Sequence, residues 1–209
     1  MSVGVVDDLR AGGSLNLASF SVSQYHEMIR SGILREGDPI ELIEGVLLRK
    51  DRRDQTGGIM THGARHLRVL KKLTTLLMAR VDANRCHVQA QGPIRVSENS
   101  EPEPDCSLIR GTPDDYAQEV PQAADAWAIF EVADSSLRTD QQTKQRLYAT
   151  AAIAPYVIIN LKSDLVEVYE KPIPTEQRYE HCTEYRCGEQ VSLLIAGLGT
   201  LTLNVSDLL

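Results

Sequence analysis

Residues 126–132, Ala-Trp-Ala-Ile-Phe-Glu-Val, constrain the fold of this chain more than any other stretch. The run is apolar on both faces, which is typical of a strand buried in the centre of a sheet. Its one acid, Glu131, would be costly to desolvate without a cation or a strong hydrogen-bond partner. The run therefore predicts a central strand whose carboxylate has such a partner beside it.

A second carboxylate, Asp105, follows Pro104 and opens the short apolar run Cys106 to Ile109, which is typical of a strand. Two carboxylates on adjacent strands could share a hard divalent ion, because such ions take oxygen ligands. A helix-like segment after the Glu131 strand carries Lys144. A nearby lysine can orient a nucleophile or stabilise developing negative charge. The three residues together indicate a metal-dependent phosphodiesterase site.

The order of four short motifs resembles that of the Uma-type family, bacterial proteins described as restriction endonucleases within the PD-(D/E)XK nuclease superfamily. The motifs are Glu41-Leu42-Ile43-Glu44-Gly45, Pro104-Asp105, Glu131-Val132 and Lys144-Gln145-Arg146-Leu147-Tyr148-Ala149. The resemblance runs from about Phe20 to the end of the chain. In the general superfamily pattern the lysine stands two residues after the glutamate, where this chain has Ala133. In the Uma-type branch the lysine lies on the following helix, as Lys144 does. The family's Ser-Pro-Ser after the glutamate strand is altered here, to Asp134-Ser135-Ser136.

The resemblance implies an α/β fold like that of restriction endonucleases, a mixed β-sheet flanked by helices. We expect one domain, residues 19–209, after a flexible N-terminal segment, residues 1–18. The implied function is Mg²⁺-dependent hydrolysis of DNA phosphodiester bonds, with Mn²⁺ as a substitute. Asp105 and Glu131 would hold the metal, with the main-chain carbonyl of Val132 as a further ligand. Lys144 would position the water or stabilise the transition state, and Glu41 would complete the metal shell or accept a proton.

Each of these roles has a simpler, non-catalytic alternative. Glu41 could be an ordinary edge-strand glutamate. Lys144 lies four residues after Asp140, so the two could form a surface salt bridge worth a few tenths of a kcal/mol. The whole chain could be a catalytically silent binding or assembly module, because a fold does not prove an activity. A further alternative keeps the metal but replaces DNA with RNA or a nucleotide.

The charge is distributed unevenly along the chain. The net charge of −7 argues against a protein that binds nucleic acid over its whole surface. Residues 49–85, however, contain ten Lys or Arg and only three Asp. Such a positive segment could steer a phosphate backbone, or it could be no more than a solvated helix face. The candidate nucleic-acid contacts are four residues of a predicted long helix: His62, Arg65, Arg68 and Lys72.

Periodicity predicts the remaining elements. We expect a capped helix from Ser19 to Gly32, a hairpin over 39–50 turning at Glu44-Gly45, and the long helix over 62–83. The apolar stripe of that helix would be Leu67, Leu70, Leu73, Leu77 and Val81. Further strands are expected at 88–96, 156–160, 165–169, 179–186 and 190–195, with a helix from Thr139 or Asp140 to about Ala152 and a final strand or short helix at 201–209.

Cellular context is predicted by the same composition. No apolar run approaches the roughly eighteen residues of a membrane span. Four cysteines without regular spacing favour a reducing cytoplasm, and zinc at His181, Cys182 and Cys187 is not expected because a fourth ligand is missing. Cleavage of both DNA strands usually needs two sites, which predicts a homodimer.

Overall fold

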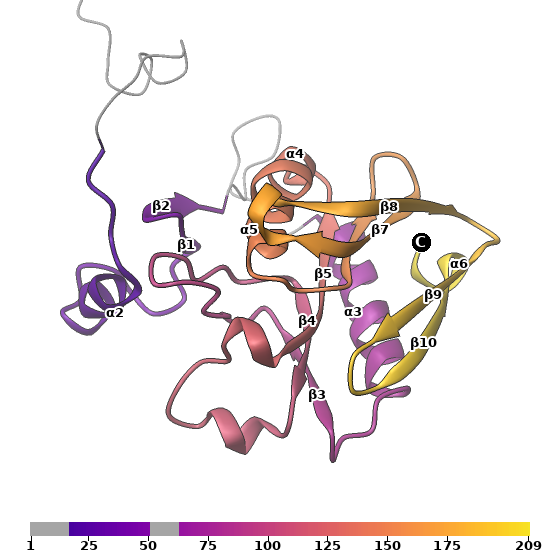
Figure 1. The fold of residues 1–209 in the computed structure, drawn as a ribbon, viewed down its shortest axis with the longest axis horizontal. Coiled ribbons are helices and arrows are strands. Elements are labelled where there is room, and N and C mark those ends of the chain that lie inside the picture. The colour runs from indigo at the N-terminus through magenta and orange to yellow at the C-terminus, as the bar shows by residue number, and fades with distance from the viewer. Residues whose placement is uncertain (1–16, 51–62) are drawn as a thin grey trace, which may run out of the picture.

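The computed structural model describes residues 17–50 and 63–209. Its centre is a six-stranded mixed sheet in the order β3-β4-β5-β6-β7-β8 (Figure 1). The strands are β3 (Cys86–Ala90), β4 (Cys106–Arg110), β5 (Ala126–Ala133), β6 (Tyr156–Asn160), β7 (Leu165–Ile173) and β8 (Arg178–Arg186). Only β5 and β6 are parallel, and all other neighbours are antiparallel. The mixed sheet and the interior position of β5 confirm the predicted fold class.

The crossover between β5 and β6 is the part of the fold that positions Lys144. Parallel neighbours need a crossover connection, and a helix usually supplies it. Here it consists of α4 (Leu137–Thr139), a π-helical turn η3 (Asp140–Lys144) and α5 (Gln145–Thr150). The expected helix is therefore present, but a π turn interrupts its regular α-helical geometry.

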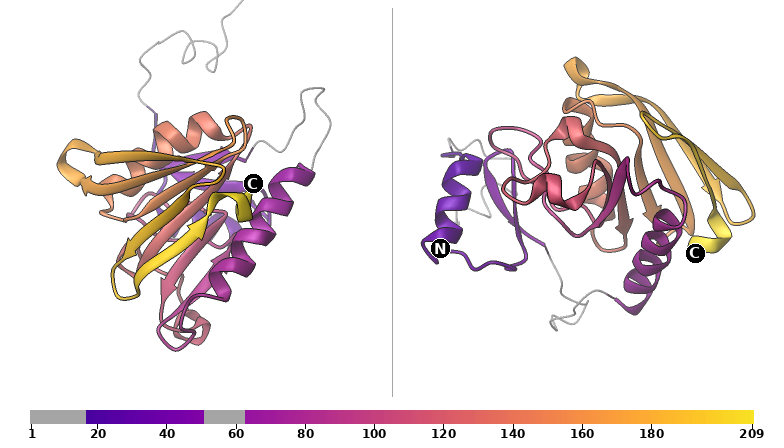
Figure 2. Two further views of the ribbon diagram at one scale, coloured as in Figure 1. Left: turned by 90° about the vertical axis from the view of Figure 1, so that its right-hand side faces the viewer. Right: turned by 90° about the horizontal axis from the view of Figure 1, so that it is seen from below.

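One face of the sheet is covered by α3 (Ala64–Met78) and by the hairpin of β9 (Gln190–Ile195) and β10 (Gly199–Asn204), with α6 (Val205–Leu208) after it (Figure 2). Val69, Leu73 and Leu77 of α3 pack into one apolar core with side chains of β4, β5 and β6. The predicted stripe was wrong at Leu67, which is 38% exposed, whereas Val69 is fully buried. The buried stripe thus comprises Val69, Leu70, Leu73 and Leu77.

The other face is covered by the crossover helices and long loops. Tyr148 of α5 and Tyr156 of β6 are fully buried there, with ring centroids 5.0 Å apart. The connection between β4 and β5 contains two 3-10 turns, η1 (Pro113–Tyr116) and η2 (Ala123–Asp125). The expected strand over 88–96 is confined to β3, since the chain leaves the sheet at Gln91, whose φ is 53°.

The N-terminal part forms a small unit at the end of the molecule away from the β9–β10 hairpin (Figure 1). It comprises α2 (Val22–Arg30) and the predicted hairpin of β1 (Ile40–Ile43) and β2 (Val46–Arg49). A capping box of Ser21 and Gln24 begins α2. Gly45 has a φ of 79°, and a Cβ there would lie 2.4 Å from that of Ser19, so the turn requires glycine. Leu42 bridges to Glu101 and joins this hairpin to the rest of the fold.

Several expectations concern residues outside the described part. The flexible segment, 1–18, lies almost wholly outside it, as does His62. Within residues 17–50 and 63–209, no helix is long and apolar enough to cross a membrane.

Candidate active site

The sheet brings Asp105 and Glu131 together. Cys106 of β4 pairs with Phe130 of β5, so Asp105, one residue before β4, lies beside Glu131. The Asp105 N–H donates to Glu131 Oε2 at 3.2 Å, and the Val132 N–H donates to Asp105 Oδ2 at 2.9 Å. These bonds hold the two predicted metal carboxylates in one place on adjacent strands.

Lys144 reaches the same point from the π-helical turn. Its side chain is buried, at 6% exposure, and Nζ donates to Glu131 Oε1 at 2.8 Å. Nζ also lies 4.0 Å from Asp140 Oδ1. The alternative of a surface salt bridge is therefore wrong, because both residues of the Asp140–Lys144 pair are buried and Lys144 contacts Glu131 more closely.

Glu41 enters the cluster from the separate β1–β2 hairpin. It is buried, and its Oε2 lies 3.7 Å from Lys144 Nζ and 3.9 Å from Lys50 Nζ. The same oxygen accepts the Glu103 N–H at 3.1 Å. These contacts do not fit an ordinary exposed glutamate on an edge strand, so the structure places all four predicted catalytic side chains in one cluster.

Electrostatics in the cluster are dominated by burial. Burial raises the pKa of Glu131 to about 8, against the lowering effect of Lys144, and nearby Asp140 and Asp105 raise it further. At Lys144, burial lowers the pKa, but Glu131 and Glu41 together raise it well above its usual value. At Asp105, burial opposes ionisation, yet the hydrogen bond and charge of His66 leave its pKa below the usual value. Lys144 is therefore a cation at neutral pH.

His66 is a site residue that the sequence interpretation missed. It lies in the first turn of α3, and its Nε2 is 3.0 Å from Asp105 Oδ2. A signal was available, because His66 shares the helical face of Leu70, Leu73 and Leu77 and is the polar residue of a buried stripe. Tyr148 was also missed. Its hydroxyl donates to Glu131 Oε1 at 3.3 Å, and burial raises its pKa so that it stays protonated.

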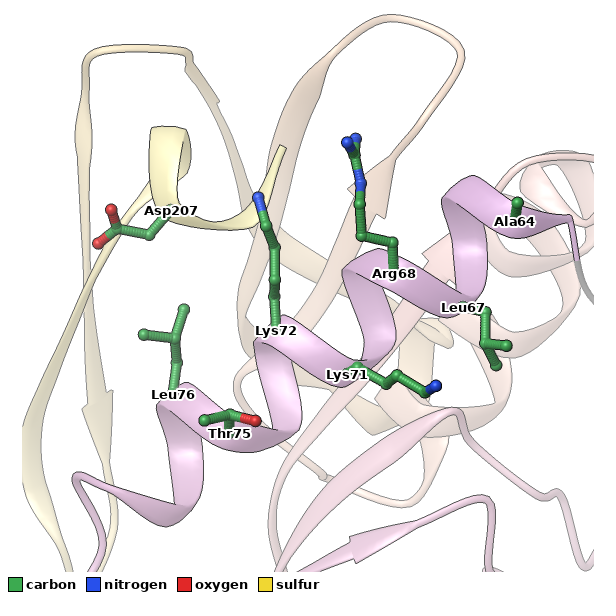
Figure 3. A pocket seen from close by; sticks show the side chains of 8 residues that line it. All are labelled: Ala64, Leu67, Arg68, Lys71, Lys72, Thr75, Leu76 and Asp207. Carbon is green, nitrogen blue, oxygen red and sulfur yellow. The ribbon is translucent and has the colours of Figure 1, made fainter.

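Arg65, Arg68 and Lys72, the three predicted nucleic-acid contacts that the structure describes, lie elsewhere on α3. Arg65 pairs with Asp164 and donates to the Leu161 carbonyl at 2.6 Å. Arg68 and Lys72 extend side by side from α3 toward α6 (Figure 3), where Lys72 Nζ lies 3.4 Å from the Leu208 carbonyl oxygen. Together with Lys71 they line a groove of ≈ 650 Å³. This groove is lined by residues of α3 and by Asp207 of α6, and His66 is not among them.

The carboxylates suit a hard divalent ion better than a soft one. Mg²⁺ is usually held by one or two carboxylates and keeps several waters. Asp105 and Glu131 supply two such groups, and Asp105 Oδ1 accepts no hydrogen bond from another described residue. No set of three His, Cys, Asp or Glu side chains in the described ranges is arranged to hold a metal. An ion here would therefore rely on these two carboxylates together with main-chain or water oxygens.

This chain is similar to known proteins in both sequence and fold. A family profile named Uma2 and described as "Putative restriction endonuclease" matches residues 22–206. A crystal structure of a "putative nuclease belonging to DUF820" from Anabaena variabilis ATCC 29413 superposes with a TM-score of 0.65 and 14% identity, covering 90% of this chain and 97% of that chain. That likeness shows the fold, and no curated protein matches. Because the profile spans most of the chain, this protein belongs to the Uma2 family.

Proposed function

We propose that this chain is a metal-dependent endonuclease that hydrolyses DNA phosphodiester bonds. One observation carries the proposal: the carboxyl groups of Glu41, Glu131 and Asp140 lie within 4.0 Å of the buried Lys144 ammonium, and Asp105 lies beside Glu131. A cluster of four carboxyl groups beside one ammonium favours the binding of a divalent cation, which takes oxygen ligands. Membership of the Uma2 family supports a nuclease function, and this fold is generally associated with divalent metals.

Asp105 and Glu131 would hold Mg²⁺ or Mn²⁺, with the main-chain carbonyl of Val132 as a further ligand. When bound, the ion supplies charge neutralisation at the phosphate and a more acidic water. His66 orients Asp105 through the contact at 3.0 Å, and Tyr148 orients Glu131. The chain thus keeps both carboxylates in place before substrate arrives, which removes a reorganisation cost from the reaction.

Lys144 acts as a cation and donor rather than as a base, because Glu131 and Glu41 raise its pKa well above the usual value. Its ammonium either stabilises the charge that develops on the phosphate oxygens or orients the attacking water. Glu41, 3.7 Å from Lys144 Nζ, is the remaining acceptor. It completes the metal shell or takes a proton from the water.

DNA is the proposed partner, and α3 is its proposed contact. Arg68, Lys71 and Lys72 gather positive charge on the outer face of this helix, although the chain as a whole has a net charge of −7. Arg65 and His62 are further candidate contacts to DNA, but Arg65 already forms an ion pair with Asp164. Cutting both strands requires a second site, which a homodimer would supply.

The test is nicking of supercoiled plasmid with Mn²⁺ by the wild type, Asp105→Asn and Lys144→Ala. We expect the wild type to cut and both variants to lose cleavage by orders of magnitude, since the lost interactions act in the transition state. Mn²⁺ should also raise the Tm of the wild type and of Lys144→Ala, but not that of Asp105→Asn. An unchanged Mn²⁺ effect in Asp105→Asn would contradict the metal assignment.

A silent binding module is the second candidate. It is favoured by the direct contact of Lys144 with Glu131, because this hydrogen bond already occupies one oxygen of a carboxyl group that would hold the metal. The plasmid assay separates the two candidates. Background activity of the wild type on DNA and RNA substrates, together with a Tm that Mn²⁺ does not change, would favour the module.

A further inference from the structure

A second buried carboxylate, Glu167, lies on the same face of the sheet as Glu131. Glu131 of β5 pairs with Ile158 of β6, which pairs with Glu167 of β7, and residues opposite one another on neighbouring strands point to one face. Glu167 is 3% exposed. No Lys, Arg or His of the described residues forms an ion pair with it. Its burial must therefore be compensated by neutral donors.

Three neutral side chains satisfy both oxygens of Glu167. Gln141 Nε2 donates to Oε1 at 2.9 Å and to Oε2 at 3.0 Å. Asn160 Nδ2 donates to Oε1 at 2.8 Å, and the Tyr169 hydroxyl donates to Oε2 at 2.7 Å. Carboxyl oxygens accept hydrogen bonds, so each of these contacts joins a donor to an acceptor. Gln141 is part of η3, and this carboxylate therefore ties the π-helical turn to the sheet.

The π-helical turn has a hydrogen-bond pattern that an ordinary helix lacks. The Gln145 N–H donates to the Asp140 carbonyl, five residues earlier. The buried Tyr156 hydroxyl donates to the same carbonyl at 3.1 Å. Each residue of a regular α-helix advances the direction of the side chain by about 100°. A return of η3 to α-helical geometry would therefore rotate Lys144 relative to the residues before it and away from its present contact.

Ion pairing alone does not select the position of Lys144. Three carboxylates, those of Glu131, Glu41 and Asp140, lie within 4.0 Å of its Nζ, and a flexible lysine side chain could pair with any of them. The shortest contact, 2.8 Å to Glu131, depends on where the backbone of η3 places the Lys144 Cα. The interactions that fix the η3 backbone therefore decide which carboxyl group accepts a hydrogen bond from Lys144 Nζ.

We infer that Glu167, acting through Gln141, is a positioning residue that keeps residues 140–144 π-helical and so holds the Lys144 ammonium on Glu131. The geometric part, the position of Lys144, follows from the hydrogen bonds of Glu167 and Gln141 alone. Its catalytic consequence rests on the proposed function, because only there does the place of Lys144 affect cleavage.

The geometric part is tested by chemical labelling of metal-free protein. Acetic anhydride followed by peptide mass spectrometry gives the acetylation rate of each lysine, with exposed Lys171 as the internal reference. Gln141→Ala should raise the rate at Lys144 by about tenfold, the change that leaving a buried acceptor without its donor produces. Gln141 is exposed, so this substitution leaves no cavity in the core.

Gln142→Ala is the matched control. Gln142 is also an exposed residue of η3, but its side chain contacts Arg138 at 3.3 Å rather than the sheet. We expect its Lys144 labelling to equal that of the wild type. The free energy of unfolding of each protein, measured in urea, gives the part of the acetylation rate that comes from global unfolding. An unchanged rate in Gln141→Ala, or an equal rise in both variants, would overturn the inference.

A double-mutant cycle tests the catalytic part. Gln141→Ala should lower kcat for plasmid nicking with little change in KM, and should cause no further loss in a Lys144→Ala background. Equal losses in both backgrounds would show that Gln141 acts independently of Lys144 and would overturn the positioning role. If neither the wild type nor any variant cuts DNA, the proposed function is wrong. The acetylation rates would still show whether Glu167 and Gln141 position Lys144.

Discussion

Glu131 should make the metal-free protein less stable as the pH rises. Burial, together with Asp140 and Asp105, raises the pKa of Glu131 from 4.5 to about 8 in the folded chain, although Lys144 lowers it. Between these values the folded chain binds a proton that the unfolded chain has released. The free energy of unfolding therefore falls as pH increases through this window, which is opposite to the behaviour of a salt-bridged carboxylate with a lowered pKa.

The size of the effect follows from the two pKa values. Each pKa unit corresponds to about 1.4 kcal/mol, so a rise from 4.5 to about 8 corresponds to about 5 kcal/mol. This destabilisation is absent below pH 4.5 and complete above about pH 8. It is comparable with the whole stability of a small domain, roughly 5–15 kcal/mol, and should be easy to detect.

The assay is urea unfolding in EDTA at intervals from pH 5 to pH 8, followed by the fluorescence of Trp127, the one tryptophan of the chain. Glu131→Gln removes the titrating group, so the wild type should lose about 1.4 kcal/mol per pH unit relative to this variant. Glu176→Gln, an exposed glutamate on a surface turn, is the control and should follow the wild type. Parallel pH profiles for the wild type and Glu131→Gln would refute the reasoning.

Two further predictions concern α3. Leu73→Ala should cost about 2–5 kcal/mol of unfolding free energy, because Leu73 is fully buried, whereas Leu67→Ala should cost under about 1 kcal/mol. Equal costs in urea unfolding would contradict the observed stripe. Arg68→Ala and Lys72→Ala should each reduce the slope of log DNA affinity against log salt by about one. Salt-independent binding in a titration of fluorescent duplex would exclude α3 as a phosphate contact.

Local patterns in the sequence were sufficient for much of the fold. The apolar run 126–132 predicted a central strand because burial on both faces leaves no polar alternation. The β1–β2 hairpin was predictable because Gly45 at a φ of 79° is a local requirement of the turn. For Asp105, Glu131 and Lys144, spacing and resemblance to a family were enough to select residues that the structure brings together.

Helix α3 shows where periodicity was insufficient. Leu67 and Val69 lie within the same amphipathic pattern, and either could belong to the stripe. The tertiary packing decides which of them is buried, since Val69 belongs to the apolar core that the sheet and the β9–β10 hairpin form. His66 became a site residue for the same reason: its partner Asp105 is 39 residues away, and their contact depends on how α3 packs on β4 and β5.

The sequence by itself determined where most strands, turns and helices form and which carboxyl groups are candidate metal ligands, because these patterns depend on residues close together in the chain. Only the tertiary structure decided that Lys144 is buried, since its neighbours Gln141, Gln142, Gln145 and Arg146 are polar and describe a solvated helix equally well. The same holds for Glu41, which reaches the cluster from a separate hairpin. Burial and electrostatic interaction depend on residues that are far apart in the chain, so no local sequence pattern can predict them.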